Sequence, residues 1–308
     1  MTDLQSARSL LMVRPVSFGF DQETAQSNTF QHELPLSKTE MRKRACDEFD
    51  TAVELLRSHA IEVVVFEDTP FPEKPDAVFP NNWLSTWPDG MTYLYPMATE
   101  SRRIERSEDV ISLLNKRWDI RHIVDNSRAE VEGTYLESTG VMIFDHIHKI
   151  VYGCLSIRCN EDLFRHHADE RGYKPIVFHA VNETGFPIYH TNVLMGIQTS
   201  TAVVCLDAIK ARDEREMVEA QLRHTGHEVI PITQAQMNSF CGNILEVRND
   251  AKESFIVLSQ TAYDAFTEAE RAQLSENATL LPISIPTIET VGGGSARCMM
   301  AEIFLPKR

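Results

Sequence analysis

The sequence predicts an α/β fold built from a repeated strand–strand–helix–strand unit, and three observations lead to this prediction. Short apolar runs alternate with amphipathic stretches along the 308 residues. The same order of elements recurs over roughly 50–60 residues, about four or five times. No Pro/Ser-rich linker separates the units. We therefore expect one α/β domain over residues 1–308, with internal pseudo-repetition.

The first unit shows the patterns most clearly. The apolar run Leu10–Val13 predicts a strand that Arg14-Pro15 ends, and the β-branched run Ile61–Phe66 predicts a second, buried strand. Between them, residues 38–59 are expected to form a helix that begins at a capping box, Ser37-Lys-Thr-Glu40. Apolar residues recur at helical spacing on one face of it, at Met41, Ala45, Phe49, Ala52, Val53 and Leu56.

The later units repeat these patterns. Strands are expected at Tyr93–Tyr95, Val141–Phe144, Ile150–Leu155, Pro175–His179, Val193–Ile197, Ala202–Cys205, Glu228–Ile232, Ile244–Val247, Phe255–Leu258, Leu280–Ile283 and Met299–Phe304. Helices are expected at residues 103–117, 161–170, 210–225 and 267–275. The last helix begins with a second capping box, Thr267-Glu-Ala-Glu270.

The composition excludes several classes of function. The formal charge is −15, from 45 acidic against 30 basic side chains, which argues against nucleic acid or an anionic membrane as a partner. No apolar run reaches the roughly 18 residues of a membrane helix, and the N-terminus lacks a signal-peptide pattern, so a cytoplasmic protein is expected. Among six cysteines, Cys154 and Cys159 form a C-x4-C pair, but no second pair completes a zinc site.

The segment Gly292-Gly-Gly-Ser-Ala-Arg-Cys298 is the most unusual in the chain. Three consecutive glycines allow the backbone to turn sharply and to approach a ligand closely. Cys298 follows, beside Arg297, so its thiol is a candidate nucleophile. The alternatives are a plain turn with a buried cysteine, or a phosphate-binding loop, although the usual phosphate-loop motifs are absent.

Two histidine-containing segments also attract attention. His190 comes just before a strongly apolar strand, where a side chain often projects at a sheet edge. Asp145-His146-Ile147-His148 resembles a metal-binding pair, but a solvated hairpin tip is the simpler interpretation, and no metal site is expected there.

Other charged residues stand at strand ends or strand entries. Glu132 and Glu137 lie in an otherwise small and apolar strand entry, where a carboxylate is costly to bury unless it is paired. Asp76 interrupts an apolar stretch that ends in Asn81-Asn82, and Arg158 ends a strand. Turn capping or ion pairing is the alternative explanation for each.

Together these motifs resemble the guanidine-modifying (amidinotransferase) superfamily, which includes arginine deiminase, dimethylarginine dimethylaminohydrolase and glycine amidinotransferase. The order is P-D-x-x-F-x-x-[DN], L-E-x-x-G, S-x-R, H-x-[DN] and then G-G-G-x-x-x-C. The N-terminal Met12-Val-Arg-Pro15 and Phe18-Gly-Phe20 look more like the arginine-deiminase-related branch that contains bacterial citrulline-utilisation hydrolases. The resemblance implies a five-bladed, pseudo-symmetric α/β propeller of ββαβ units.

The resemblance also implies a catalytic constellation. Cys298 would be the nucleophile, His190 the general acid/base and Glu137 its carboxylate partner. Glu137 matches the family glutamate better than Glu132, which is the fallback. A thiolate would attack the guanidino or ureido carbon, and the histidine would protonate the departing amine and then activate water. No metal or other cofactor is required.

Departures from the family pattern bear on the substrate. Arginine-using relatives carry carboxylates where this chain has Asn81-Asn82 and Asn192. An amide offers a donor and an acceptor, which matches a neutral ureido group better than a guanidinium. Asp76 is the acidic group retained in that segment.

Arginine side chains are expected to bind the α-carboxylate of the substrate. Arg158 resembles the strand-end arginine that does so in relatives, and Arg103, or else Arg102, is expected to assist it. The hypothesis is therefore a cysteine hydrolase that cleaves a C–N bond of a ureido or guanidino amino acid, with citrulline to ornithine favoured.

Several alternatives stay open. They are an arginine deiminase, a dimethylarginine hydrolase, a non-catalytic ligand-binding protein on the same fold and, least favoured, a Cys/His peptidase or acyltransferase. A homo-oligomer is possible. Asp21–Leu36 is a plausible mobile loop, and the roles of Cys241 and Asn243 stay open.

Overall fold

The computed structural model describes residues 5–308, and within them fifteen strands form five three-stranded sheets. In strand order the sheets are β15 (Ala301–Ile303), β1 (Ser9–Arg14), β2 (Glu62–Glu67); β3 (Leu84–Thr86), β4 (Met91–Leu94), β5 (His122–Asp125); β6 (Ile143–Asp145), β7 (Ile150–Cys154), β8 (Lys174–Phe178); β9 (Met195–Ile197), β10 (Thr201–Val204), β11 (Glu228–Pro231); and β12 (Leu245–Arg248), β13 (Ser254–Ser259), β14 (Thr279–Ile283).

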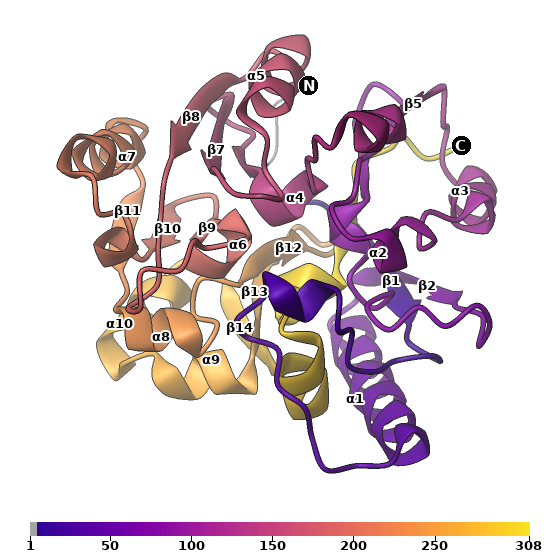
Figure 1. Cartoon of the computed structure of the whole chain (residues 1–308). Helices are drawn as coiled ribbons and strands as arrows, with labels where there is room; N and C mark the ends of the chain where they lie inside the picture. The colour runs from indigo at the N-terminus through magenta and orange to yellow at the C-terminus, as the bar shows by residue number, and fades with distance from the viewer. Residues whose placement is uncertain (1–4) are drawn as a thin grey trace.

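Every sheet repeats one pairing pattern. The first strand runs antiparallel to the middle strand, and the third runs parallel to it. A parallel pair needs a crossover connection, and a helix supplies it in each unit. The principal crossover helices are α1 (Lys38–Ser58), α3 (Glu108–Asn115), α5 (Glu161–Glu170), α7 (Arg212–His224) and α10 (Glu268–Ser275). The predicted repeat is thus found in all five sheets, which follow one another around the middle of the molecule (Figure 1).

The helix of the first unit confirms the periodicity on which it was predicted. All six apolar residues of the expected face of α1 are buried. Ser37 accepts a hydrogen bond from the backbone N–H of Glu40, but the return half of the predicted capping box is not formed. At α10 both halves of the Thr267/Glu270 box are present.

The structure corrects several predicted boundaries. The helix predicted over 103–117 is the shorter α3, which begins after its N-cap Ser107, and a separate short helix, α2 (Glu100–Arg103), precedes it. Three predicted strands start later than expected, since a short helical turn comes first. These turns are α4 (Ser138–Val141) before β6, α6 (Thr191–Leu194) before β9 and η6 (Ala296–Met299) before β15. A continuous apolar run does not distinguish a buried turn from a buried strand.

The first sheet joins the two ends of the chain. Strand β15 pairs with β1, with Ser9 opposite Ile303, while β1 pairs with β2 on its other side. This pairing brings the C-terminal glycine-rich segment and Cys298 next to the first unit. Among the described residues, no helix has the length and apolarity needed to cross a membrane.

Candidate active site

Each of the five units places one polar or reactive side chain just before its first strand. Asn82 lies in η2 (Pro80–Asn82) before β3, and Asn243 lies just before β12. Glu137 and His190 are the N-cap residues of α4 and α6, and Cys298 lies in η6. Because the units are arranged around one centre, residues far apart in the sequence meet there.

Glu137 and His190 form a fully buried pair. His190 Nε2 lies 2.6 Å from Glu137 Oε2, and the other carboxylate oxygen accepts the backbone N–H of Ala98 at 3.0 Å. Arg158 Nη1 donates to Glu137 Oε2 at 3.3 Å. Burial alone would raise the pKa of Glu137, but the Arg158 charge and the His190 contact hold it well below its usual range. Glu137 is therefore a carboxylate at neutral pH.

The same environment keeps His190 uncharged. Burial lowers the pKa of His190 to about 4 despite the contact with Glu137, and the nearby charge of Arg158 lowers it further. A neutral imidazole whose Nε2–H donates to a carboxylate has Nδ1 available as a proton acceptor. His190 therefore has the protonation state of a general base.

Two amide groups donate to the sulfur of Cys298. Asn243 Nδ2 lies 3.2 Å and Asn192 Nδ2 lies 3.4 Å from Sγ. Asn243 Oδ1 in turn accepts the backbone N–H of Arg297 at 3.0 Å, which fixes its orientation. Donors aimed at a sulfur stabilise its anion. Burial raises the pKa of the Cys154 and Cys241 thiols to about 12.

Two glycines permit the close approach of these groups. A Cβ on Gly140 would lie 2.4 Å from Asn82 Nδ2 and 3.0 Å from His190 Cε1. Gly293 has a φ of +62°, and a Cβ there would lie 2.5 Å from Gln31 Cγ. Packing therefore requires glycine at both positions, and at Gly293 the backbone conformation requires it as well.

The side chains of Cys298 and His190 line one small cavity, with a volume of about 10 Å³, close to the size of one water molecule. Its other lining residues are Thr24, Asn28, Asp76, Phe79, Asn82, Arg102, Arg158, Tyr189 and Gly292, Gly293 and Gly294. Thr24 and Asn28 belong to the segment predicted to be a mobile loop. In this structure that segment covers the cavity, with Asn28 donating to the carbonyl of Gly293 at 3.2 Å.

Asp76 is the only carboxylate that lines this cavity among the described residues. One of its oxygens accepts from the Thr24 hydroxyl at 3.0 Å, and the other has no hydrogen-bond partner. Burial raises the pKa of Asp76 to about 7, although Arg102 opposes the rise. Arg102 is held by both oxygens of Glu105 and by Asn82 Oδ1, at 2.7 to 2.9 Å.

The structure brings most of the predicted site residues together. Cys298, His190, Asp76, Asn82 and Arg158 line the cavity, while Glu137 and Asn192 contact His190 and Cys298 respectively. Arg158 is engaged by Glu137 and by Ser27 Oγ, the latter at 2.8 Å.

Three predicted residues lie apart from the cavity. Asn81 is buried against Thr139, and Arg103 donates to the Met97 carbonyl at 3.1 Å, so it is the neighbouring Arg102 that lines the cavity. Glu132, the fallback partner, is exposed.

The sequence analysis assigned no role to Asn243, whose side chain the structure places against the Cys298 sulfur. Its position before the first strand of its unit, equivalent to that of Cys298, is the signal that identifies it.

Comparisons with known proteins identify the family of the chain. Residues 14–305 match the family model described as N,N dimethylarginine dimethylhydrolase, eukaryotic. No curated protein matches the chain.

Solved structures share the fold at low identity. The N-terminal domain of ArgZ, an arginine dihydrolase from cyanobacteria, has a TM-score of 0.74 at 14% identity, covering 96% of this chain and 99% of that one. AgrE in complex with L-arginine has a TM-score of 0.73 at 13% identity over 97% of this chain, which spans 40% of the AgrE chain. A dimethylarginine dimethylaminohydrolase has a TM-score of 0.65 at 10% identity, covering 96% and 99%.

The matched family model covers nearly the whole chain. The chain therefore belongs to the N,N dimethylarginine dimethylhydrolase family, within the amidinotransferase superfamily of hydrolases that act on guanidino C–N bonds.

Proposed function

We propose that this protein is a cysteine hydrolase that cleaves a C–N bond of a ureido or guanidino amino acid through a covalent enzyme intermediate. One observation carries the proposal. The Cys298 sulfur, with two amide donors, and the neutral His190 imidazole, backed by Glu137, line the same small cavity. A nucleophile, a base and an orienting carboxylate form the arrangement that covalent catalysis requires.

The reaction follows from these protonation states. His190 accepts the thiol proton of Cys298 as the sulfur attacks the ureido or guanidino carbon and a C–S bond forms. The tetrahedral adduct collapses, the C–N bond breaks, and His190 returns the proton to the departing amine. His190 next removes a proton from water, which attacks the S-carbamoyl or S-amidino carbon. The C–S bond then breaks, and His190 returns the proton to the Cys298 sulfur. Glu137 stabilises the imidazolium that forms in both halves.

The polar lining favours a ureido substrate, and citrulline hydrolysis to ornithine is the reaction that we propose first. Arg102 and Arg158 bring positive charge to the cavity, and Asn82 Nδ2 has no hydrogen-bond partner. A neutral ureido oxygen accepts from such an amide. With a pKa of about 7, Asp76 is also available in its protonated form as a donor to that oxygen.

A second candidate is hydrolysis of arginine or a methylated arginine. The observation in its favour is that Asp76 lines the cavity and has a free carboxylate oxygen, which in its ionised form pairs with a guanidinium. The matched family and the arginine-binding relatives support the same class of substrate.

Substrate entry requires movement of the covering segment. A cavity of about 10 Å³ does not admit an amino acid. Thr24 and Ser27 hold Arg158 through a carbonyl and a hydroxyl oxygen, at 3.2 and 2.8 Å. We propose that the substrate carboxylate replaces these oxygens on Arg158 when the segment opens.

The architecture is part of the same proposal. We propose that the five sheets form a five-bladed propeller in a single domain, with the site at its central channel, and that the protein acts in the cytoplasm without a cofactor. A non-catalytic ligand-binding protein is the remaining alternative, and an inactive purified protein would favour it.

The experiment is a comparison of citrulline, arginine and dimethylarginine as substrates, with ornithine, citrulline, ammonia and dimethylamine measured separately. Cys298→Ser is the control. The proposal expects Cys298-dependent product from at least one substrate. Product formation that survives in Cys298→Ser, or no product from any of the three, would contradict it.

The pH dependence of selectivity separates the two candidates. Protonated Asp76, present below pH about 7, donates to a ureido oxygen, whereas ionised Asp76, present above it, binds a guanidinium. The ratio of kcat/KM for citrulline to that for arginine should therefore fall as the pH rises through about 7. This ratio cancels effects of thiol ionisation that both substrates share. Both activities should be lost as the pH falls through about 4, because His190 becomes protonated.

A further inference from the structure

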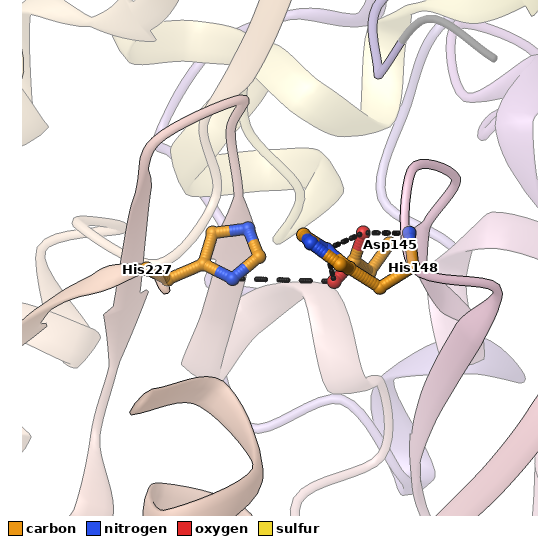
Figure 2. Close-up of side chains that lie close together, drawn as sticks. All are labelled: Asp145, His148 and His227. Atoms are coloured by element: carbon orange, nitrogen blue, oxygen red, sulfur yellow. Dashed lines mark hydrogen bonds and ion pairs between the residues drawn. The ribbon is translucent and has the colours of Figure 1, made fainter. Parts of the chain in front are cut away.

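A second cluster of imidazole and carboxylate groups lies outside the catalytic cavity. Asp145 ends β6, His148 lies in the turn between β6 and β7, and His227 immediately precedes β11. The three side chains point toward one another from two different sheets (Figure 2). None of them lines the catalytic cavity or enters the proposed reaction.

The separations within the cluster suit a metal ion. His148 Nδ1 lies 2.9 and 3.0 Å from the two Asp145 oxygens, and His227 Nδ1 lies 3.9 Å from Asp145 Oδ2. One donor atom from each residue lies within 4.8 Å of the others. A tetrahedral ion with bonds of about 2.0–2.1 Å sets its ligands roughly 3.3 Å apart. Small side-chain rotations therefore suffice to surround an ion.

Two of the three proposed ligands, Asp145 and His227, are buried. Asp145 is fully buried and also accepts the backbone N–H of His148 at 2.9 Å. His227 is 5% exposed, its Nε2 is buried without a hydrogen-bond partner, and its Nδ1 contacts the Thr225 hydroxyl at 2.9 Å. An ion bound at Nδ1 displaces the proton there. The backbone N–H of His148 therefore holds the Asp145 carboxylate in place, whereas His227 exchanges its contact with Thr225 for the ion.

We propose that Asp145, His148 and His227 form a binding site for a divalent transition metal ion of the zinc class. Two imidazoles and one carboxylate form a borderline donor set that favours such ions over Mg²⁺ or Ca²⁺, which prefer oxygen ligands. His148 is partly exposed, so an ion has access and a fourth position stays open to water. The ion links the sheet of β6–β8 to the sheet of β9–β11, and its role is to stabilise their contact.

The test uses Co²⁺ and Zn²⁺ on the full chain carrying Cys298→Ser, which removes the active-site thiol as a competing ligand. Addition of Co²⁺ should produce the visible absorption of a low-symmetry, four- or five-coordinate site, with one ion bound per chain. Zn²⁺ should displace the Co²⁺ and raise the Tm by about 5 °C when it is well above its Kd.

His148→Ala is the informative variant, because it removes a ligand from a surface turn and spares the buried core. It should weaken Zn²⁺ binding more than tenfold. His224→Ala is the matched control, since His224 is an exposed histidine at the end of α7, outside the cluster. The control should bind like the parent. Absence of stoichiometric binding, or equal affinity in the parent and His148→Ala, would overturn the proposal.

Discussion

The catalytic and the peripheral clusters both pair a buried carboxylate with a histidine, but they differ in exposure and in charge balance. At the centre His190 is buried and Arg158 supplies a cation to Glu137. At the periphery His148 is partly exposed, and a second imidazole takes the place of the cation beside Asp145. The first arrangement keeps a neutral base, His190, beside a carboxylate, Glu137. The second places the imidazoles of two histidines beside one carboxylate, Asp145. The same residue types are thereby suited to proton transfer in one place and to metal binding in the other.

The largest contrast is expected from removing one histidine from each cluster. His190→Ala should lower kcat by about 10²–10⁴-fold, because the general base is lost. His148→Ala should leave kcat unchanged under metal-free conditions. Steady-state kinetics on the substrate identified above, with circular dichroism to confirm folding, provide the measurement. An equal loss in both variants would remove the functional distinction between the clusters.

A smaller contrast is expected from neutralising the two carboxylates. Glu137→Gln should reduce kcat, because the amide no longer stabilises the imidazolium of His190. It should also cost about 3–5 kcal/mol of folding free energy, since Arg158 is left as an unpaired buried charge. Asp145→Asn should cost about 1–3 kcal/mol, the usual penalty for disrupting buried hydrogen bonds, with kcat retained.

Urea unfolding of both variants measures these costs. If Glu137→Gln proved as stable and as active as the parent, the role given to the Glu137, His190 and Arg158 contacts would be wrong.

The last prediction concerns the addition of a single methyl group at one glycine. Gly140→Ala should displace Asn82 and His190 and lower kcat by about tenfold, because the added Cβ has no room. Gly19→Ala is the matched control, since a Cβ there meets no atom within 4 Å. Similar kinetics for the two variants would show that close packing at Gly140 does not position the site.

The sequence predicts most of the residues that the structure brings together at the candidate site, and it predicts the main elements of the fold. Cys298, His190 and Glu137 follow from the order of motifs, and the crossover helices follow from periodicity and capping. Strands β3 and β5 were not predicted, because β3 has only three residues and β5 exposes most of its side chains. Adjacent residues on a helix point about 100° apart, so the choice between Arg102 and Arg103 depended on a register that periodicity does not define.

Local sequence patterns do not predict contacts between segments that lie far apart in the sequence. Substrate binding by Asn192 stays a prediction, and the contact of its amide nitrogen with the Cys298 sulfur was not predicted. His227 reaches Asp145 only because two sheets are neighbours in space. Residues Asp145–His148 were interpreted as a solvated hairpin tip because the sequence did not show that His227 lies near them.

Mass spectrometry of acid-quenched enzyme tests the central claim most directly. The protein is mixed with citrulline or arginine, stopped within one turnover, digested and mapped. We expect a carbamoyl or amidino adduct on the peptide that contains Cys298, with the other cysteines unmodified and no adduct in Cys298→Ser. Rapid turnover without any adduct on Cys298, or an adduct on a different cysteine, would contradict covalent catalysis by this residue.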